Sequence, residues 1–151
     1  MPILKRTDSK DQDFVSLVKA LDSELAVRDG DEHAFYDQFN KIDSLKHAIV
    51  IYQNNYAVGC GAIKEYNDTT MEVKRMYVLP EHRKKGYAQM VLAELEQWAK
   101  ELGFERCILE TGKKQPEAIK LYLKNGYEII PNYGQYTKVS NSVCFEKIIF
   151  V

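Results

Sequence analysis

The sequence has no excess of charge of one sign, because its 151 residues contain 21 lysines and arginines against 22 acidic residues, for a net charge of -1. General nucleic-acid binders usually carry a clear positive excess, so this balance argues against that class. No apolar run approaches the ~18–20 residues of a membrane span, and the N-terminus lacks the apolar segment of a secretion signal. We therefore predict a cytoplasmic protein with no membrane or nucleic-acid partner.

Cysteine is scarce as well, with Cys60, Cys107 and Cys144 as the three thiols of the chain. No two of them have the C-x-x-C spacing, and an odd number of cysteines cannot close a disulfide framework. Each lies in an apolar run, so we expect buried thiols. No spacing of histidine and cysteine suggests a metal site.

Proline and glycine are few, at four and eight residues, and no repeat, low-complexity tract or linker interrupts the chain. Domains cluster around ~100–150 residues. We therefore expect residues 1–151 to form one domain.

Apolar periodicity predicts most of the secondary structure. Strands are expected at Ile3–Thr7, His47–Gln53, Tyr56–Tyr66, Thr70–Leu79, Cys107–Leu109, Tyr127–Ile130 and Val143–Phe150. Helices are expected after a cap at Asp11 or Asp13, over about residues 32–40, between Gly86 and Gly103, and from Pro116 to Asn125. The order β-α-α-β-β-β-α-β-α-β-β predicts an α/β (α+β) fold with a mixed sheet and helices on both faces, because the later helices cross over between parallel strands.

The small total charge conceals two oppositely charged stretches. Between Asp8 and Asp37 there are nine acidic and three basic residues, a net charge of -6, whereas Lys74–Lys85 has five basic residues and one acidic residue, a net charge of +4. Because a charged stretch is often only a solvated surface, motifs must decide whether either stretch has a function.

Residues 76–88 combine the end of an expected strand, a basic loop and a helix N-terminus. The first turn of a helix has unpaired N–H groups and a partial positive charge, which suit an anion. Gly86 lets a ligand approach the backbone, and Arg83, Lys84 and Lys85 add full charges. The segment is neither a P-loop nor a G-x-G-x-x-G motif. It predicts a site for a phosphate-bearing cofactor or, alternatively, a solvated basic loop.

Two motifs in this sequence resemble those of the GNAT N-acetyltransferase family. The segment RKKGYA at residues 83–88 resembles the acetyl-CoA signature Q/R-x-x-G-x-G/A, and AIKLYLKNGY at residues 118–127 resembles A-I-x-L-Y-x-x-x-G-F/Y. Their spacing and the intervening helix–strand–helix order also fit, and the resemblance covers about residues 56–147. It implies a single domain whose mostly antiparallel sheet has six to seven strands and a central parallel pair that splays apart.

The resemblance also implies acetyl-CoA as the cosubstrate and roles for individual residues. The backbone of residues 83–88 would bind the diphosphate, and the pantetheine arm would pair with the strand near Met76 and Val78. The N–H of Val78 would polarise the thioester carbonyl, and Tyr122 would protonate the leaving thiolate. Gln115 stands where many members have Asn and would contact the pantetheine. The residues expected to hold acetyl-CoA are Met76, Tyr77, Val78, Arg83, Lys84, Lys85, Gly86, Tyr87, Ala88, Gln115 and Tyr122.

An amine acceptor must lose a proton before it attacks the thioester. For a lysine-like amine with a pKa of ~10.4, deprotonation at pH 7 costs about 4–5 kcal/mol, so a general base or a water chain is expected. Glu72 is the first carboxylate candidate, and Glu110, on a neighbouring expected strand, is the second.

Two functions are open at this point. The chain is either an N-acetyltransferase that acts on a primary amine of a small molecule or protein, or a non-catalytic acyl-CoA-binding module of the same fold. The acidic residues 8–37 favour a cationic acceptor, for which Asp22, Glu24 and Asp31 are the first candidates. The sequence is compatible with either a monomer or a homodimer.

Overall fold

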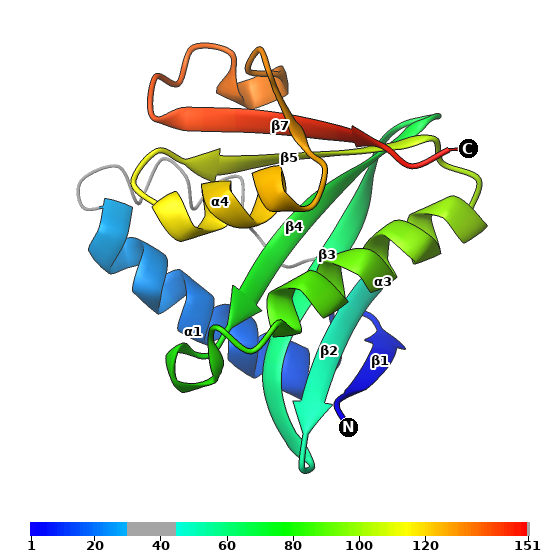
Figure 1. Ribbon diagram of the computed structural model, residues 1–151, viewed down its shortest axis with the longest axis vertical. Coiled ribbons are helices and arrows are strands. Elements are labelled where there is room, and N and C mark those ends of the chain that lie inside the picture. The colour runs from blue at the N-terminus through cyan, green and yellow to red at the C-terminus, as the bar shows by residue number, and fades with distance from the viewer. Residues whose placement is uncertain (30–44, 151) are drawn as a thin grey trace. The chain divides into compact units, whose positions relative to one another are not determined.

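The computed structural model describes residues 1–29 and 45–150, and the helix expected near residues 32–40 lies outside them (Figure 1). The chain divides into two compact units. The first unit comprises Met1–Lys64 and Val73–Gln97, and the second comprises Glu65–Glu72 and Trp98–Val151. The assignment of residues 1–151 to a single domain stays a prediction.

Seven strands in the described residues pair in the order β1-β2-β3-β4-β5-β7-β6. They are β1 (Ile3–Thr7), β2 (His47–Gln53), β3 (Tyr56–Asn67), β4 (Thr70–Val78), β5 (Arg106–Gly112), β6 (Glu128–Ile130) and β7 (Ser142–Ile148). β4 and β5 are parallel, with Thr70 opposite Arg106 and Glu72 opposite Ile108. The pairs β1–β2, β2–β3, β5–β7 and β6–β7 are antiparallel. The predicted mixed sheet and its parallel pair are therefore confirmed.

The described helices are α1 (Gln12–Asp29), α3 (Tyr87–Glu101), α4 (Pro116–Lys124) and the 3₁₀ helices η2 (Pro80–His82) and η3 (Gly134–Tyr136). The three α-helices agree with the apolar periodicity. The two 3₁₀ helices were not predicted, because a three-residue turn has no periodicity to detect. The expected hairpin between β2 and β3 is confirmed, since Asn54 and Asn55 have positive φ angles of 52° and 69°.

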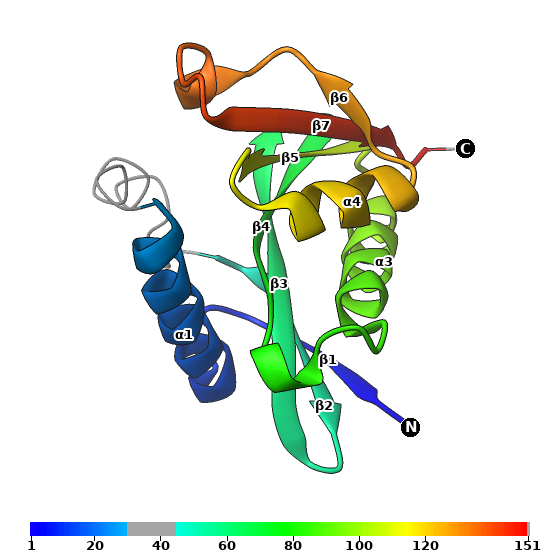
Figure 2. The ribbon, with the colours of Figure 1, turned by 60° about the vertical axis from the view of Figure 1, so that its left-hand side comes forward.

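In the first unit, α1 and the first part of α3 cover opposite faces of β2 and β3 (Figure 2). On the α1 face the core contains Phe14, Leu17, Val18, Leu21, Ala48, Val50, Cys60, Ala62 and Tyr77. On the α3 face a Cβ on Gly61 would lie 2.9 Å from side-chain atoms of both Val91 and Leu95. Glycine at this position therefore lets α3 pack close to β3. Burying each large apolar side chain contributes about 1.5–3 kcal/mol.

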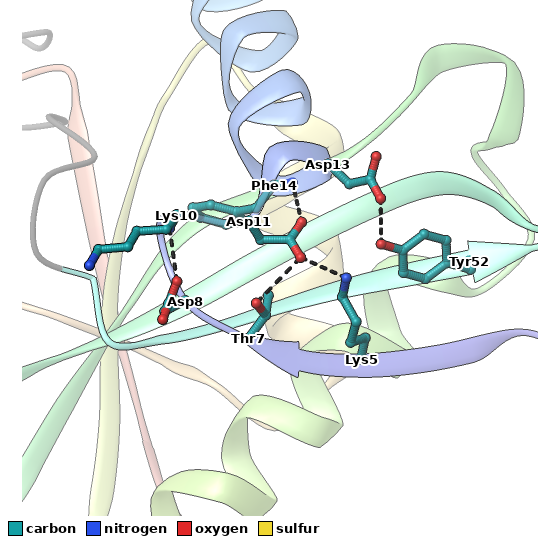
Figure 3. Close-up of polar contacts among 8 residues, drawn as sticks. All are labelled: Lys5, Thr7, Asp8, Lys10, Asp11, Asp13, Phe14 and Tyr52. Atoms are coloured by element: carbon teal, nitrogen blue, oxygen red, sulfur yellow. Dashed lines mark hydrogen bonds and ion pairs between the residues drawn. The ribbon is translucent and has the colours of Figure 1, made fainter.

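The first turn of α1 is bound to the neighbouring strands by the carboxylates of Asp11 and Asp13 (Figure 3). Asp11 caps the helix, because its Oδ1 accepts a hydrogen bond of 3.0 Å from the backbone N–H of Phe14. Its Oδ2 lies 2.6 Å from Lys5 Nζ on β1. The hydroxyl of Tyr52, on β2, donates to Asp13 Oδ2 at 2.6 Å. Both of the caps considered for this helix thus have contacts, but only Asp11 accepts the backbone bond.

In the second unit, β5, β7 and β6 form an antiparallel set, and β6 lies beside β7 in Figure 2. Arg106, on β5, binds residues of the strands on both sides of it. Its Nε donates to Thr70 Oγ1 on β4 at 2.9 Å, and its guanidinium pairs with Glu146 on β7. α4 contributes Tyr122 to the core of this unit, where its ring meets that of Phe145 at a centroid distance of 5.7 Å.

The three cysteines are buried and form no disulfide, as predicted. Burial raises the pKa of the Cys60 thiol to about 12 and that of Cys144 to about 11, so both remain protonated at neutral pH. Within residues 1–29 and 45–150, no helix is both long and apolar enough to span a membrane. The cytoplasmic location stays a prediction.

Candidate functional site

The candidate residues of the first unit lie at the end of β4 and in the loop that follows it. β4 is irregular at Arg75, whose φ angle of 60° is unusual for a residue with a side chain. The Arg75 side chain is buried, and its Nη1 donates to Asp22 Oδ1 on α1 at 2.8 Å. Its Nε is a buried donor that has no hydrogen-bond partner among residues 1–29 and 45–150. Sequence reasoning missed this pair, because its members are 53 positions apart.

Arg83 folds back over the loop between β4 and α3. Its Nε donates to the carbonyl of Val78 at 2.8 Å, and its guanidinium lies 5.5 Å from the ring centroid of Tyr77. Its Nη2 donates to both carboxylate oxygens of Glu24, at 2.8 and 3.0 Å. The Arg83 side chain therefore fixes the loop against α1 and the end of β4.

The N-terminus of α3 has the features expected of an anion site. The first intrahelical bond runs from the N–H of Met90 to the carbonyl of Gly86, at 3.1 Å, so the preceding N–H groups of the first turn have no acceptor inside the helix. Gly86 has a φ angle of 86°, and apart from its neighbours in the chain, no described residue has an atom within 4 Å of where its Cβ would be. Lys84 and Lys85 are exposed, whereas the Tyr87 side chain is buried. The open space and the positive charge both suit a diphosphate.

In the second unit, Tyr122 lies on the inner face of α4. Its side chain is 6% exposed, and its ring packs edge-on against Tyr127 at a centroid distance of 5.8 Å. Burial, and secondarily the charge of Glu110, raises the pKa of its phenol well above the usual value. Tyr122 therefore stays protonated at neutral pH, as a proton donor must.

Glu72, the first general-base candidate, is only 7% exposed on β4. Its Oε2 accepts a hydrogen bond of 2.6 Å from the hydroxyl of Tyr133, in the segment between β6 and β7. Burial and the neighbouring Glu72 raise the pKa of the Tyr133 phenol far above its usual value. The rings of Tyr66 and Tyr136 pack edge-on against Tyr133, at centroid distances of 5.3 and 5.8 Å.

Glu110, the second candidate, accepts a hydrogen bond of 2.6 Å from Ser142 Oγ. Burial raises the pKa of Tyr136, and the charges of Glu110 and Glu72 raise it further. In the second unit, both carboxylates thus act on Tyr136. Sequence reasoning assigned no role to Tyr133 or Tyr136. The signal available was two tyrosines three residues apart in a segment that also contains Asn132 and Gly134.

Gln115 is the residue that precedes the first turn of α4. Its backbone N–H donates to the carbonyl of Gly112 at 3.0 Å. Its Nε2 lies 3.7 Å from where a Cβ on Gly112 would be, so the amide covers the end of β5. Its contact with a pantetheine arm stays a prediction.

The structure places the predicted residues in two groups. The first unit contains Met76, Tyr77, Val78, Arg83, Lys84, Lys85, Gly86, Tyr87 and Ala88, and the second contains Glu72, Glu110, Gln115 and Tyr122. Of the acidic residues expected to attract a cationic acceptor, Asp22 and Glu24 form ion pairs with Arg75 and Arg83. Asp31 lies outside the described residues.

Comparisons of the sequence with known proteins give consistent matches. The model of the Acetyltransferase (GNAT) family matches residues 14–127. The uncharacterised N-acetyltransferase YsnE of Bacillus subtilis is 34% identical over 98 residues, which cover 64% of this chain and 65% of that relative. The aminoalkylphosphonate N-acetyltransferase of Salmonella typhimurium is 29% identical over 145 residues, which cover 91% of this chain and 92% of that protein. The chain thus spans slightly under two thirds of YsnE and nearly all of the second relative.

Solved structures show the same fold. A candidate acyl-CoA N-acyltransferase from Klebsiella pneumoniae superimposes with a TM-score of 0.83 at 30% identity, over 99% of each chain. The PaiA N-acetyltransferase of Thermoplasma acidophilum, in complex with coenzyme A, has a TM-score of 0.72 at 16% identity, over 98% of this chain and 99% of that one. The second likeness concerns the fold alone.

Proposed function

Because this chain belongs to the GNAT acetyltransferase family, we propose that it is an acetyl-CoA-dependent N-acetyltransferase that moves an acetyl group directly to a primary amine within a ternary complex. The observation that carries the proposal is the family match over residues 14–127, which contains the whole of the acetyl-CoA signature at residues 83–88 and the second motif at residues 118–127. Relatives that are named N-acetyltransferases support the reaction class.

Acetyl-CoA is the proposed cosubstrate. Proteins of the same fold from Thermoplasma acidophilum and Elizabethkingia anophelis contain coenzyme A and acetyl-CoA, respectively, in their structures. In this chain, the backbone N–H groups of residues 83–88 bind the diphosphate, and the exposed ammonium groups of Lys84 and Lys85 add charge. The space beside Gly86 supports this assignment, because a diphosphate needs close access to the backbone. Met76, Tyr77 and Val78 contact the pantetheine arm, with Gln115 as a further contact.

The proposed chemistry assigns two groups to the thioester. The backbone N–H of Val78 polarises the carbonyl and stabilises the negative charge that develops on its oxygen, which is typically a large catalytic contribution. Tyr122 donates its phenolic proton to the thiolate as the carbon–sulfur bond breaks. The phenol of Tyr122 is protonated at neutral pH, which this role requires.

Glu72 is the proposed general base, which accepts a proton from the acceptor ammonium so that the neutral amine can attack. Its burial and its 2.6 Å hydrogen bond with Tyr133 support the choice, since they hold one carboxylate in a defined place. Glu110 and a chain of water molecules are the alternatives.

We propose a cationic primary amine as the acceptor, such as a polyamine, an aminoglycoside or a lysine side chain. The acidic residues 8–37 first suggested this choice, but Asp22 and Glu24 form ion pairs with Arg75 and Arg83 and are less available to an acceptor. Glu72 and Glu110 support it better, because both are acidic and the charges of both raise the pKa of the same residue, Tyr136.

The test is a thiol-release assay with the purified protein, acetyl-CoA and a panel of primary amines. We expect release of coenzyme A with at least one amine and none from a Gly86→Glu variant. Tight coenzyme A binding without release with any amine would instead indicate a non-catalytic acyl-CoA-binding module. A panel that includes anionic amino acids and aminoalkylphosphonates beside polyamines also tests the charge of the acceptor.

A further inference from the structure

The hydrogen bond between Tyr133 and Glu72 joins residues that are 61 positions apart in the chain. The phenolic O–H donates to Oε2 at 2.6 Å, and both residues lie within the second unit. Glu72 is 7% exposed on β4. A buried carboxylate without a donor is costly, so the placement of Glu72 depends on partners such as this phenol.

The segment that carries Tyr133 is itself held in place by hydrogen bonds. The N–H of Tyr136 donates to the carbonyl of Tyr133 at 2.9 Å, and Thr137 Oγ1 donates to the carbonyl of Gly134 at 2.7 Å. Asn132 Nδ2 donates to the carbonyl of Val139 at 3.0 Å, which closes the segment on itself. The Tyr133 phenol is therefore presented to Glu72 from a defined position.

The rings around Tyr133 restrict it further. Tyr66 and Tyr136 both pack edge-on against its ring, at interplanar angles of 76° and 89°. Tyr136 is 2% exposed and belongs to the core of the unit. Burial raises the pKa of the Tyr133 phenol, so its proton stays on the oxygen and Tyr133 remains a donor at neutral pH.

We propose that Tyr133 is a positioning residue that orients the Glu72 carboxylate for proton abstraction from the acceptor amine. This inference rests on the proposed N-acetyltransferase function and on Glu72 as its base. The Glu72 carboxylate, held at Oε2 by the phenol, takes the proton from the ammonium nitrogen. Tyr133 itself transfers no proton. Loss of the Tyr133 hydroxyl keeps the carboxylate but removes this restraint on its orientation, and a mispositioned base lowers the rate of the chemical step.

The test is a double-mutant cycle of Tyr133→Phe and Glu72→Gln, measured as kcat and KM with the best amine of the panel. We expect Tyr133→Phe to lower kcat about tenfold while the KM for acetyl-CoA changes less than twofold. In the Glu72→Gln background, Tyr133→Phe should have no further effect on kcat, because its target is gone. Tyr56→Phe is the control, since it removes the same oxygen from an exposed side chain in the first unit.

Several outcomes would overturn the inference. An unchanged kcat in Tyr133→Phe, or a loss that is equally large in the Glu72→Gln background, would show that the hydroxyl acts otherwise than through Glu72. Wild-type activity in Glu72→Gln would refute the base itself. If Tyr133→Phe fails to fold, Glu72→Asp replaces it, because the shorter side chain withdraws the carboxylate from the phenol. An unchanged kcat in Glu72→Asp would then contradict the inference. Absence of turnover by the wild-type protein would refute the proposed function and this inference with it.

Discussion

At the scale of single residues, Tyr122 carries the most direct prediction. Its ring packs between Tyr127 and Phe145, so phenylalanine preserves the packing and removes only the hydroxyl. We expect Tyr122→Phe to lower kcat by about 10²-fold, which is typical of losing a general acid, with little change in coenzyme A affinity. Steady-state kinetics and calorimetric titration with coenzyme A measure the two quantities. Tyr127→Phe is the control, and a kcat for Tyr122→Phe within twofold of wild type would refute the assignment.

Gly86 allows a second prediction, because the chain contains a matched control. Gly86 and Gly103 have φ angles of 86° and 92°, and both have open space where a Cβ would be. A side chain at either position costs about 1–2 kcal/mol of backbone strain. Gly86→Glu should abolish coenzyme A binding, since it adds bulk and negative charge at the proposed diphosphate site, whereas Gly103→Glu should leave binding intact. Equal losses of affinity in the two variants would mean that strain, and not the site, is responsible.

The residue contacts that sequence reasoning missed are those between distant positions. The motif at residues 83–88 identified Arg83, but its pairing with Glu24 joins residues 59 positions apart, and no local pattern encodes it. The same holds for Tyr133 and Glu72. Such pairs form only when the sheet and helices have brought their residues together. The sequence therefore indicated Arg83 and Glu72 as candidate site residues, but it did not indicate their hydrogen-bond partners.

At the scale of elements, the start of α1 gives a prediction about pH. Burial tends to raise the pKa of Asp11, but its bonds with Lys5 and the Phe14 N–H outweigh this and leave the pKa below 3.8. Because the folded-state pKa is depressed, the stabilisation is present above pH 3.8 and is lost as the pH falls through the folded-state pKa. Asp11→Ala should cost about 1–2 kcal/mol of unfolding free energy at pH 7, and the difference should shrink below pH 4.

Urea denaturation of wild type and Asp11→Ala between pH 7 and pH 2.5 measures this difference. Asp68→Ala is the control, because Asp68 is exposed in the turn between β3 and β4 and caps no helix. A difference between wild type and Asp11→Ala that is constant across the pH range would show that the charge of Asp11 contributes nothing.

The elements themselves were largely predictable, and their ends were not. Apolar spacing located α3 and α4, and β-branched runs located most strands, because burial of one face dictates these patterns. β5 extends from Arg106 to Gly112, well beyond the expected Cys107–Leu109, since its outer residues are positioned by pairing with β7. Pairing partners supply the boundaries that composition alone does not encode.

At the scale of the whole molecule, the acidic and basic stretches were expected to serve different substrates, but some of their residues bind each other. The acidic and basic stretches partly neutralise each other inside the first unit, through Asp22 with Arg75 and Glu24 with Arg83. The two stretches therefore balance each other partly because their residues form ion pairs within the protein, in addition to any complementarity with substrates. The basic loop remains positive through Lys84 and Lys85, which are exposed.

This arrangement predicts the effect of removing the Glu24 charge. Glu24→Gln leaves the Arg83 guanidinium bound to the Val78 carbonyl but no longer neutralised, so the positive potential at the proposed diphosphate site increases. We expect coenzyme A to bind about two- to fivefold more tightly at low ionic strength, and the gain to disappear in 1 M salt, where the Debye length is about 3 Å.

Glu65→Gln is the control, because it removes the same charge from an exposed position in the second unit. A weaker affinity in Glu24→Gln would show instead that Glu24 is needed to hold Arg83, and an equal gain in both variants would show that only the total charge matters. If the KM of the amine rises in Glu24→Gln while coenzyme A affinity is unchanged, Glu24 serves the acceptor, as the acidic stretch first suggested.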